Sequence, residues 1–207
     1  ILIDEYDQPI ISAYMNSFYK EGISFYRNIL STVLKDNEYL EKAILTGILR
    51  VAKESIFSGL NNLYVDSILT NQFNYFGLSE GEVLDALKYY ERDYEIQEVK
   101  EWYNGYTFGK NLVYNPWSII NFIKADELKS FWINTSTNDL IRDGLSNLSK
   151  SNYNNFVKLT NGENIDIEIE ENISFETLER ESTIWNLMMF SGYLSLTENA
   201  QIRFVNK

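Results

Sequence analysis

The chain has 207 residues, 44% of them hydrophobic and 23% charged, a composition typical of a globular protein with one large domain or two small ones. It contains no cysteine and no histidine, which excludes disulfides, thiolate nucleophiles, Cys/His zinc sites and any catalytic triad with an imidazole base. The net charge of -12 argues against direct nucleic-acid binding, and no apolar run reaches the ~18 residues that a membrane span needs. Carboxylates, hydroxyls, Lys, Arg and hard cations such as Mg2+ remain for chemistry. The lack of cysteine is compatible with the cytoplasm, where we expect the protein.

The N-terminal stretch, Ile-Leu-Ile-Asp-Glu-Tyr-Asp-Gln-Pro, is an apolar run that ends in acids. Residues 1–3 predict a strand. From Ile11 the apolar residues recur near helical spacing, with Gly22 as a candidate break between two helices. A second apolar run, residues 43–45, predicts another strand that ends at Thr46. This βαβ pattern predicts two parallel strands that are joined by a right-handed crossover and buried on both faces.

The next clear element is a helix that follows residue 79. Ser79 and Glu82 have the spacing of a capping box, in which each side chain bonds the backbone N–H of the other. Val83, Leu84 and Leu87 follow, and we expect them on the buried face of this helix.

The stretch that begins at Trp102 carries two turn signals, Asn104-Gly105 and Gly109-Lys110-Asn111, and predicts a hairpin or short irregular strands. The Asn-Pro pair at 115–116 predicts the N-terminus of a helix. Trp117, Ile120 and Ile123 are expected on the buried face of that helix.

The C-terminal third predicts a strand and then a winged-helix module. Residues 164–173 alternate isoleucines with acids, the pattern of one half-buried strand whose acidic face is solvated. A helix is expected to stop at Gly192 and to be followed by strands at 193–197 and 202–205. A helix followed by two strands is the end of a winged helix.

Polar residues with a possible catalytic role follow both N-terminal strands. The carboxyl edge of a parallel sheet is where ligands bind in open α/β folds. There we expect Asp4 to hold Mg2+ through water and Glu5 to act as the base that polarises the attacking water. Thr46 is expected to sense the γ-phosphate of ATP, and Arg50 is a weaker candidate for a phosphate contact. Asp7 is a candidate for supporting either acid.

Other interpretations stay open at this point. Asp4 and Glu5 can mark an ordinary junction of strand and loop, and Thr46 can belong to a simple turn. A metal-dependent phosphatase or nuclease built on Asp4, Glu5 and Asp7 is a further alternative, although no basic residues lie nearby in the sequence. The phosphate-binding motif G-x-x-x-x-G-K-[ST] is not in the chain, and its nearest match, residues 105–111, has the wrong spacing. We therefore expect that the phosphate-binding half precedes Ile1 and that the chain is a fragment.

Seven stretches occur in an order that resembles the bacterial AAA-ATPase-like family. They are LIDEYDQPI, TGILRVAKESIFSGLNNL, YFGLSEGEV, WYNGYTFG, VYNPWSIINFI, WINTSTNDLI and SGYLSL, and together they run from Leu2 to about Leu196. That family is related to the STAND-type P-loop ATPases, and its members often carry a PD-(D/E)XK nuclease-like domain at the C-terminus. The resemblance implies that Asp4 and Glu5 are the Walker B acids, that Thr46 lies in the sensor segment, and that the complete protein uses ATP and Mg2+.

These observations predict an α/β fold in two parts. Residues 1–78 are expected to form the C-terminal half of a P-loop NTPase parallel sheet, and residues 79–207 a mostly helical lid and winged-helix-like region. The expected function is that of an ATPase or nucleotide-dependent switch that regulates a nuclease-like domain in the same polypeptide, with the fragment inactive by itself. Self-association through the strand edge beside Ile1 is a second expected contact. The alternative is a catalytically silent protein-interaction module of the same fold.

Overall fold

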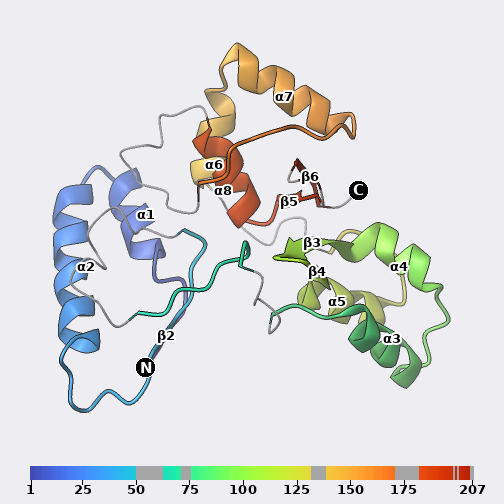
Figure 1. The fold of residues 1–207 in the computed structure, drawn as a ribbon, viewed down its shortest axis with the longest axis horizontal. Coiled ribbons are helices and arrows are strands. Elements are labelled where there is room, and N and C mark those ends of the chain that lie inside the picture. The colour runs from blue at the N-terminus through green and yellow to red at the C-terminus, as the bar shows by residue number, and fades with distance from the viewer. Residues whose placement is uncertain are drawn as a thin grey trace. The chain divides into compact units, whose positions relative to one another are not determined.

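The computed structural model describes residues 1–49, 63–70, 76–131, 139–170, 182–197, 199 and 201–205. The chain divides into two compact units (Figure 1). Unit 1 comprises Ile1–Val65 and Ile169–Phe190, and unit 2 comprises Asp66–Glu168 and Ser191–Lys207. The fold is mixed α/β, as predicted, and each sheet in the described residues has two strands. The division expected at residues 78 and 79 stays a prediction.

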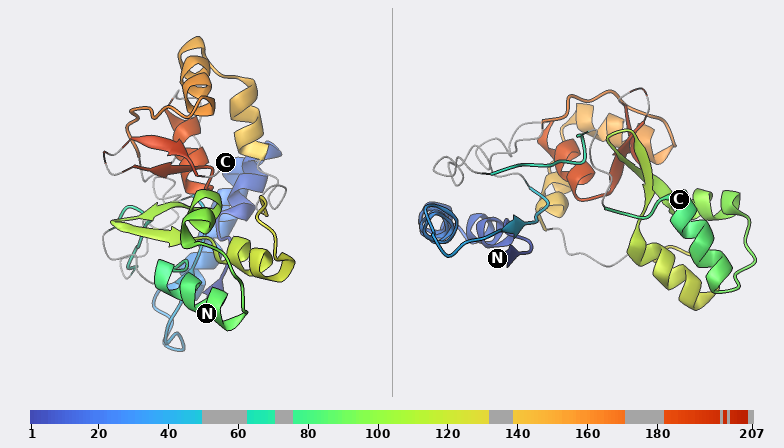
Figure 2. Two further views of the ribbon diagram at one scale, coloured as in Figure 1. Left: turned by 90° about the vertical axis from the view of Figure 1, so that its right-hand side faces the viewer. Right: turned by 60° about the horizontal axis from the view of Figure 1, so that its bottom comes forward.

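Unit 1 contains β1 (Leu2–Ile3), α1 (Gln8–Met15), α2 (Tyr19–Leu34), β2 (Ile44–Leu45) and α8 (Thr183–Phe190). The two strands are parallel, as the βαβ pattern predicts, with Leu2 opposite Ile44 and Ile3 opposite Leu45. The connection between them forms α1 and α2, which pack side by side (Figures 1 and 2). Both strands are short, and the candidate functional site lies at their carboxyl ends.

Two helices form between the strands, but the break does not lie at Gly22. It lies at residues 16–18, where Ser17 has a positive φ of 62°. Gly22 is inside α2, and a Cβ atom there would lie 2.5 Å from the Cβ of Ala13 on α1. The glycine therefore allows close packing of the two helices and does not end one of them.

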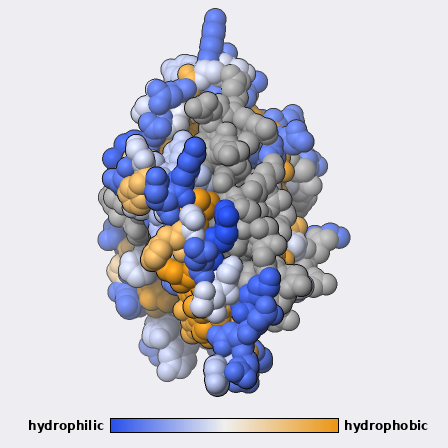
Figure 3. Space-filling model, turned by 90° about the vertical axis from the view of Figure 1, so that its left-hand side faces the viewer, coloured by the Kyte–Doolittle hydropathy of each residue, from blue (hydrophilic) through white to orange (hydrophobic). Residues whose placement is uncertain are grey.

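The prediction that β1 and β2 are buried on both faces is wrong. Leu2 is 82% exposed and its register partner Ile44 is 59% exposed, whereas Ile3 and Leu45 on the opposite face are half-buried. One face of this small sheet is therefore open, because the described layers do not enclose both sides of it. Phe25 on α2 is 68% exposed as well, and Figure 3 shows hydrophobic residues among hydrophilic ones on the side of the molecule where α2 lies.

The last helix of unit 1, α8, is buried around its whole circumference from residue 183 to residue 189. Thr183 and Asn186 are polar and the other five of these residues are apolar, so this helix lies in an interior position. Within the described residues no helix combines the length and the apolar character that crossing a membrane requires.

Unit 2 contains the remaining elements. They are α3 (Glu80–Tyr89), α4 (Ile96–Tyr103), β3 (Asn104–Phe108), β4 (Asn111–Tyr114), α5 (Pro116–Ala125), α6 (Asp139–Ser146), α7 (Lys150–Thr160), β5 (Leu194–Leu196) and β6 (Ile202–Phe204). A core forms where α3, α4, β4 and α5 meet, made of Val83, Leu87, Val99, Tyr103, Tyr114, Ile119, Phe122 and Ile123. Each such side chain contributes on the order of 1.5–3 kcal/mol through burial.

The starts of α3 and α5 in unit 2 agree with the sequence, but some buried faces do not. Ser79 and Glu82 form the predicted capping box of α3, and the Asn115 side chain caps α5. Leu84, however, is 44% exposed, Trp117 is 57% exposed and Ile120 is 49% exposed. The helices turn other residues inward, including Ile119 and Phe122 on α5, because packing against the neighbouring elements decides the buried face.

Two antiparallel pairs complete unit 2. Of the two predicted forms, the hairpin is present, made of β3 and β4 with its turn at residues 109–110 and a register irregularity between Asn104 and Tyr106. The turn signal at residues 104–105 lies inside β3 and does not form the turn. The predicted terminal strands form β5 and β6, also antiparallel. The order of helix, strand and strand is thus present, while the winged-helix assignment stays a prediction.

The predicted strand at 164–173 is not formed over the part that is described. Within residues 164–170 only Ile165 pairs, through a single bridge to Ile202, and residues 171–173 lie outside the described ranges. The alternation does appear in the burial, since Ile165 is buried while Asp166 and Glu168 are exposed.

Candidate functional site at the carboxyl ends of β1 and β2

The parallel pairing of β1 and β2 brings Asp4 and Thr46 to one edge of the sheet. The Thr46 N–H donates to the Ile3 carbonyl at 2.9 Å, and the Thr46 carbonyl accepts from the Tyr6 N–H at 2.9 Å. The ladder therefore continues past the strand ends and holds the two following loops together. This is the geometry that the sequence predicts for Asp4 and Thr46.

Asp4 and Thr46 contact each other directly. The Thr46 hydroxyl donates to Asp4 Oδ1, which also accepts the backbone N–H of Glu5 at 3.1 Å. Both side chains are exposed. The Asp4 carboxylate is therefore held in place by two donors while it stays accessible from solvent, as a ligand for a hydrated cation must be.

Glu5 is exposed and has a φ of 50°, in the left-handed region. For a residue other than glycine this conformation costs on the order of 1–2 kcal/mol. Such backbone strain is often found at functional sites. Glu5 follows Asp4 directly in sequence and lies in the turn that connects β1 to α1.

Asp7 is the residue whose role the sequence did not show. It is fully buried, and its Oδ2 accepts the N–H of Ile48 at 3.1 Å and the N–H of Leu49 at 2.8 Å. Asp7 stands at the N-cap of α1, but its side chain makes no capping bond there. Burial raises the pKa of Asp7, the bonds from Leu49 and Ile48 lower it, and the charge of Glu5 raises it further.

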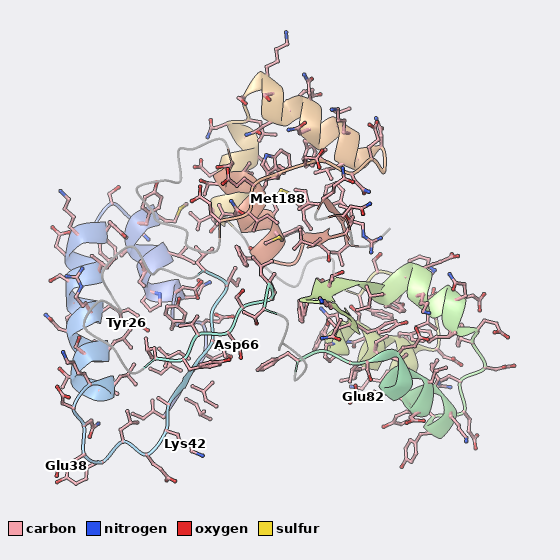
Figure 4. All side chains as sticks on the ribbon, viewed as in Figure 1. Tyr26, Glu38, Lys42, Asp66, Glu82 and Met188 are labelled. Carbon is pink, nitrogen blue, oxygen red and sulfur yellow. The ribbon has the colours of Figure 1, made fainter. Side chains whose placement is uncertain are left out.

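Tyr6 and Gly47 complete the link between the two loops. The Tyr6 hydroxyl donates to the Leu49 carbonyl at 2.6 Å. A Cβ atom on Gly47 would lie 2.7 Å from Asp7 Oδ1 and 2.7 Å from the Tyr6 ring, so only glycine fits this close approach without a shift. On α2, burial and the charge of Asp7 raise the pKa of Tyr26, which Figure 4 labels.

The remaining candidate, Arg50, lies outside the described residues. Among the described residues no group of three or more acids is arranged to hold a metal ion by itself. Asp7 is turned into the interior, so it does not join the exposed Asp4 and Glu5 as a third ligand. The arrangement suits a site of the kind in which Mg2+ has one or two carboxylates, several waters and substrate phosphates as ligands.

Residues 1–57 match the model of a protein family described as predicted AAA-ATPase. That range contains β1, β2 and the loops that follow them, so the family match and the site geometry concern the same part of the chain. The match supports a relationship with the AAA-ATPase-like family over this segment.

One similar protein is described as "Uncharacterized protein in vnfD 5'region" from Azotobacter chroococcum mcd 1. It is 29% identical to this chain over 147 residues, which is 70% of this chain and 28% of the relative. The chain thus spans little more than a quarter of the length of the curated relative that it matches. No solved structure matches the chain significantly.

Proposed function

We propose that this chain is part of a P-loop ATPase or nucleotide-dependent switch and that the exposed carboxyl edge of β1 and β2 faces Mg2+-ATP. One observation carries the proposal: the parallel strands place Asp4 and Thr46 in direct contact at the edge where open α/β sheets bind ligands. The family match over residues 1–57 supports the same conclusion.

In the proposed mechanism each polar residue has a separate task. Asp4 would hold Mg2+, because its carboxylate is exposed and fixed by two donors. Glu5 takes the proton of the attacking water. Thr46 senses the γ-phosphate from the neighbouring strand, and Arg50 is kept as a weaker candidate for a phosphate contact. Bound Mg2+ would neutralise the phosphate charge that develops during transfer.

The proposal requires a phosphate-binding loop from outside this chain. The nearest candidate within it, residues 105–111, includes most of β3 and the start of β4, so it does not connect a strand to a helix as a P-loop does. We propose that a Walker A segment lies in a part of the full protein that this chain does not include. The β1 edge would then pair with that segment or with a second chain.

The finer features of the proposal follow the family resemblance. They are a P-loop parallel sheet over residues 1–78, a helical lid and winged helix over residues 79–207, membership of the STAND type, and a nuclease-like domain in the same polypeptide that the nucleotide state controls. A cytoplasmic location belongs to the same proposal. The match over residues 1–57 supports the ATPase part more directly than it supports the effector.

A second candidate function is a catalytically silent interaction module. The open apolar face formed by Leu2 and Ile44 favours it, since such a face suits a protein contact without any need for nucleotide. The two functions differ in whether the intact protein binds ATP with a requirement for Mg2+ and Asp4.

The test uses the protein that carries residues 1–207 together with the Walker A segment. Glu5→Gln is expected to keep ATP binding and to lose turnover, because the metal ligand remains while the base is removed. Asp4→Asn is expected to weaken Mg2+-dependent binding as well. Turnover that is unchanged in both variants would show that the assigned roles are wrong.

A further inference from the structure

The described part of the chain contains one buried carboxylate that the proposed mechanism does not use. Asp7 has no exposed surface, and its Oδ1 has no hydrogen-bond partner among the described residues. The side-chain bonds to the loop after β2 therefore pass through Oδ2, which accepts the amides of Ile48 and Leu49, while the backbone carbonyl of Asp7 accepts N–H groups of α1. A buried carboxylate is costly, so we expect Asp7 to do more in this place than fill space.

The two amides that Asp7 binds lie just beyond Thr46. Only Gly47 separates Thr46 from Ile48, and Gly47 is packed against both Asp7 and the ring of Tyr6. On the other side of Thr46, its N–H and carbonyl are bonded to Ile3 and Tyr6. Thr46 is thus held on one side by the strand ladder and on the other by Asp7, with its hydroxyl on Asp4.

We infer that Asp7 is a positioning residue that fixes the loop after β2 so that the Thr46 hydroxyl stays in contact with Asp4. This inference rests on the proposed function, in which Thr46 senses the γ-phosphate beside the metal ligand. Asp7 itself touches neither metal nor nucleotide, because it is buried while Asp4 and Thr46 are exposed. Its effect on turnover passes through Thr46.

A double-mutant cycle separates this role from a general structural one. In the protein with the Walker A segment, Asp7→Ala is expected to lower kcat about 10- to 100-fold with little change in KM, since a small displacement of a catalytic group has effects of that order. Thr46→Val removes the hydroxyl and keeps the shape of the side chain. In the Thr46→Val background, Asp7→Ala is expected to have little further effect. Independent, multiplying effects of the two changes would overturn the inference.

The conservative variant Asp7→Asn supplies the matched control. Its amide oxygen still accepts the two backbone amides, so kcat is expected to return most of the way to that of the unmodified protein. Asp7→Leu keeps the branched shape of the side chain and removes both acceptor oxygens. If Asp7→Ala does not fold, Asp7→Leu replaces it in every comparison. Equal loss in Asp7→Asn and Asp7→Leu would contradict the role of the acceptor.

A second measurement does not depend on ATP. Three-bond couplings in the NMR spectrum report whether the Thr46 side chain has one rotamer. We expect one rotamer in the unmodified protein and in Asp7→Asn, and averaging over several in Asp7→Leu. A protein that does not bind Mg2+-ATP would disprove the proposed function, whereas an unchanged Thr46 rotamer in Asp7→Leu would disprove the positioning role.

Discussion

Unit 1 and unit 2 each contain a carboxylate that accepts backbone amides, and the two differ in burial. Asp7 in unit 1 is buried and binds Ile48 and Leu49, whereas Glu82 in unit 2 is exposed and binds Ser79 at 2.7 Å (Figure 4 labels Glu82). The backbone and side-chain bonds from Ser79 lower the pKa of Glu82, while burial raises that of Asp7. The same type of bond thus accompanies opposite pKa shifts, because desolvation outweighs hydrogen bonding only at the buried site.

The two carboxylates also differ in how far they reach along the chain. Glu82 and Ser79 are three residues apart, so their contact stabilises one helix start. Asp7 reaches residues more than 40 positions away and joins the ends of two strands. A local bond can be lost with local consequences, whereas the loss of the Asp7 bonds is expected to disturb the whole candidate site.

The largest expected effect is that of Asp7→Ala on the loop after β2. It leaves two amides without an acceptor, and a buried donor left without a partner costs about 1–3 kcal/mol. We expect a loss of about 2–3 kcal/mol in the local stability of residues 44–49, measured by amide hydrogen exchange. Exchange in α3 serves as the internal control and is expected to stay unchanged. Equal acceleration in both regions would show that Asp7 does not act locally.

Gly47→Ala is expected to have the next largest effect. The added methyl group collides with Asp7 and the Tyr6 ring, and overpacking of this kind costs about 1–2 kcal/mol. The matched control is Gly81→Ala in α3, where a Cβ atom meets nothing within 4 Å. That control is expected to keep or raise stability in urea unfolding, since alanine favours helix more than glycine does. Two variants of equal stability would contradict the packing described around Gly47.

Ser79→Ala tests the local contact in unit 2, the capping box at the start of α3. It removes the hydroxyl that accepts the Glu82 N–H, and the loss of such an N-cap costs about 1 kcal/mol. Faster hydrogen exchange is expected in the first turns of α3, with no change in residues 44–49. Ser79→Asp, which can also cap, is expected to restore most of the protection, and failure of that rescue would count against the capping role.

The smallest expected effect is on the pH dependence of stability, which we expect to have opposite signs around Asp7 in unit 1 and Glu82 in unit 2. The folded pKa of Asp7 is raised from 3.8, so its contribution to stability is present at low pH and is lost as the pH rises through the folded pKa. The folded pKa of Glu82 is lowered from 4.5, so its contribution is present above the unfolded pKa and is lost as the pH falls through the folded value.

Amide protection factors measured across this pH range test the sign of the pH dependence in each region. We expect the protection of residues 44–49 to fall with rising pH and that of α3 to fall with decreasing pH. Asp7→Asn and Glu82→Gln are expected to remove the respective slope. Slopes of the same sign in both regions would mean that burial does not dominate at Asp7.

The sequence predicted the elements whose signals are local. The capping box of Ser79 and Glu82, the Asn-Pro helix start and the two N-terminal strands are confirmed, because each depends on neighbouring residues. The buried faces of α5 and of β1 were predicted less well. Which side chains of an amphipathic segment are buried depends on the layers that pack against it, and these layers come from distant parts of the chain.

The same distinction applies to the candidate site. The meeting of Asp4 and Thr46 could be predicted, because parallel strands bring their carboxyl ends to one edge. The role of Asp7 could not, since an aspartate just before a helix normally indicates an N-cap. Its true partners, Ile48 and Leu49, offer only backbone amides, which leave no mark in the sequence. Gly47 was the available signal, but a glycine after a strand is more often part of a simple turn.

The most direct test of the account is calorimetric titration of ATP, with and without Mg2+, into the protein that carries both the Walker A segment and residues 1–207. Asp4→Asn is compared with Asp85→Asn, which removes an exposed acid on α3 in unit 2. We expect Mg2+-dependent ATP binding in the unmodified protein and in Asp85→Asn, and a marked loss in Asp4→Asn. Binding of equal strength in all three proteins, or no binding in any of them, would contradict the claim that the edge of β1 and β2 faces Mg2+-ATP.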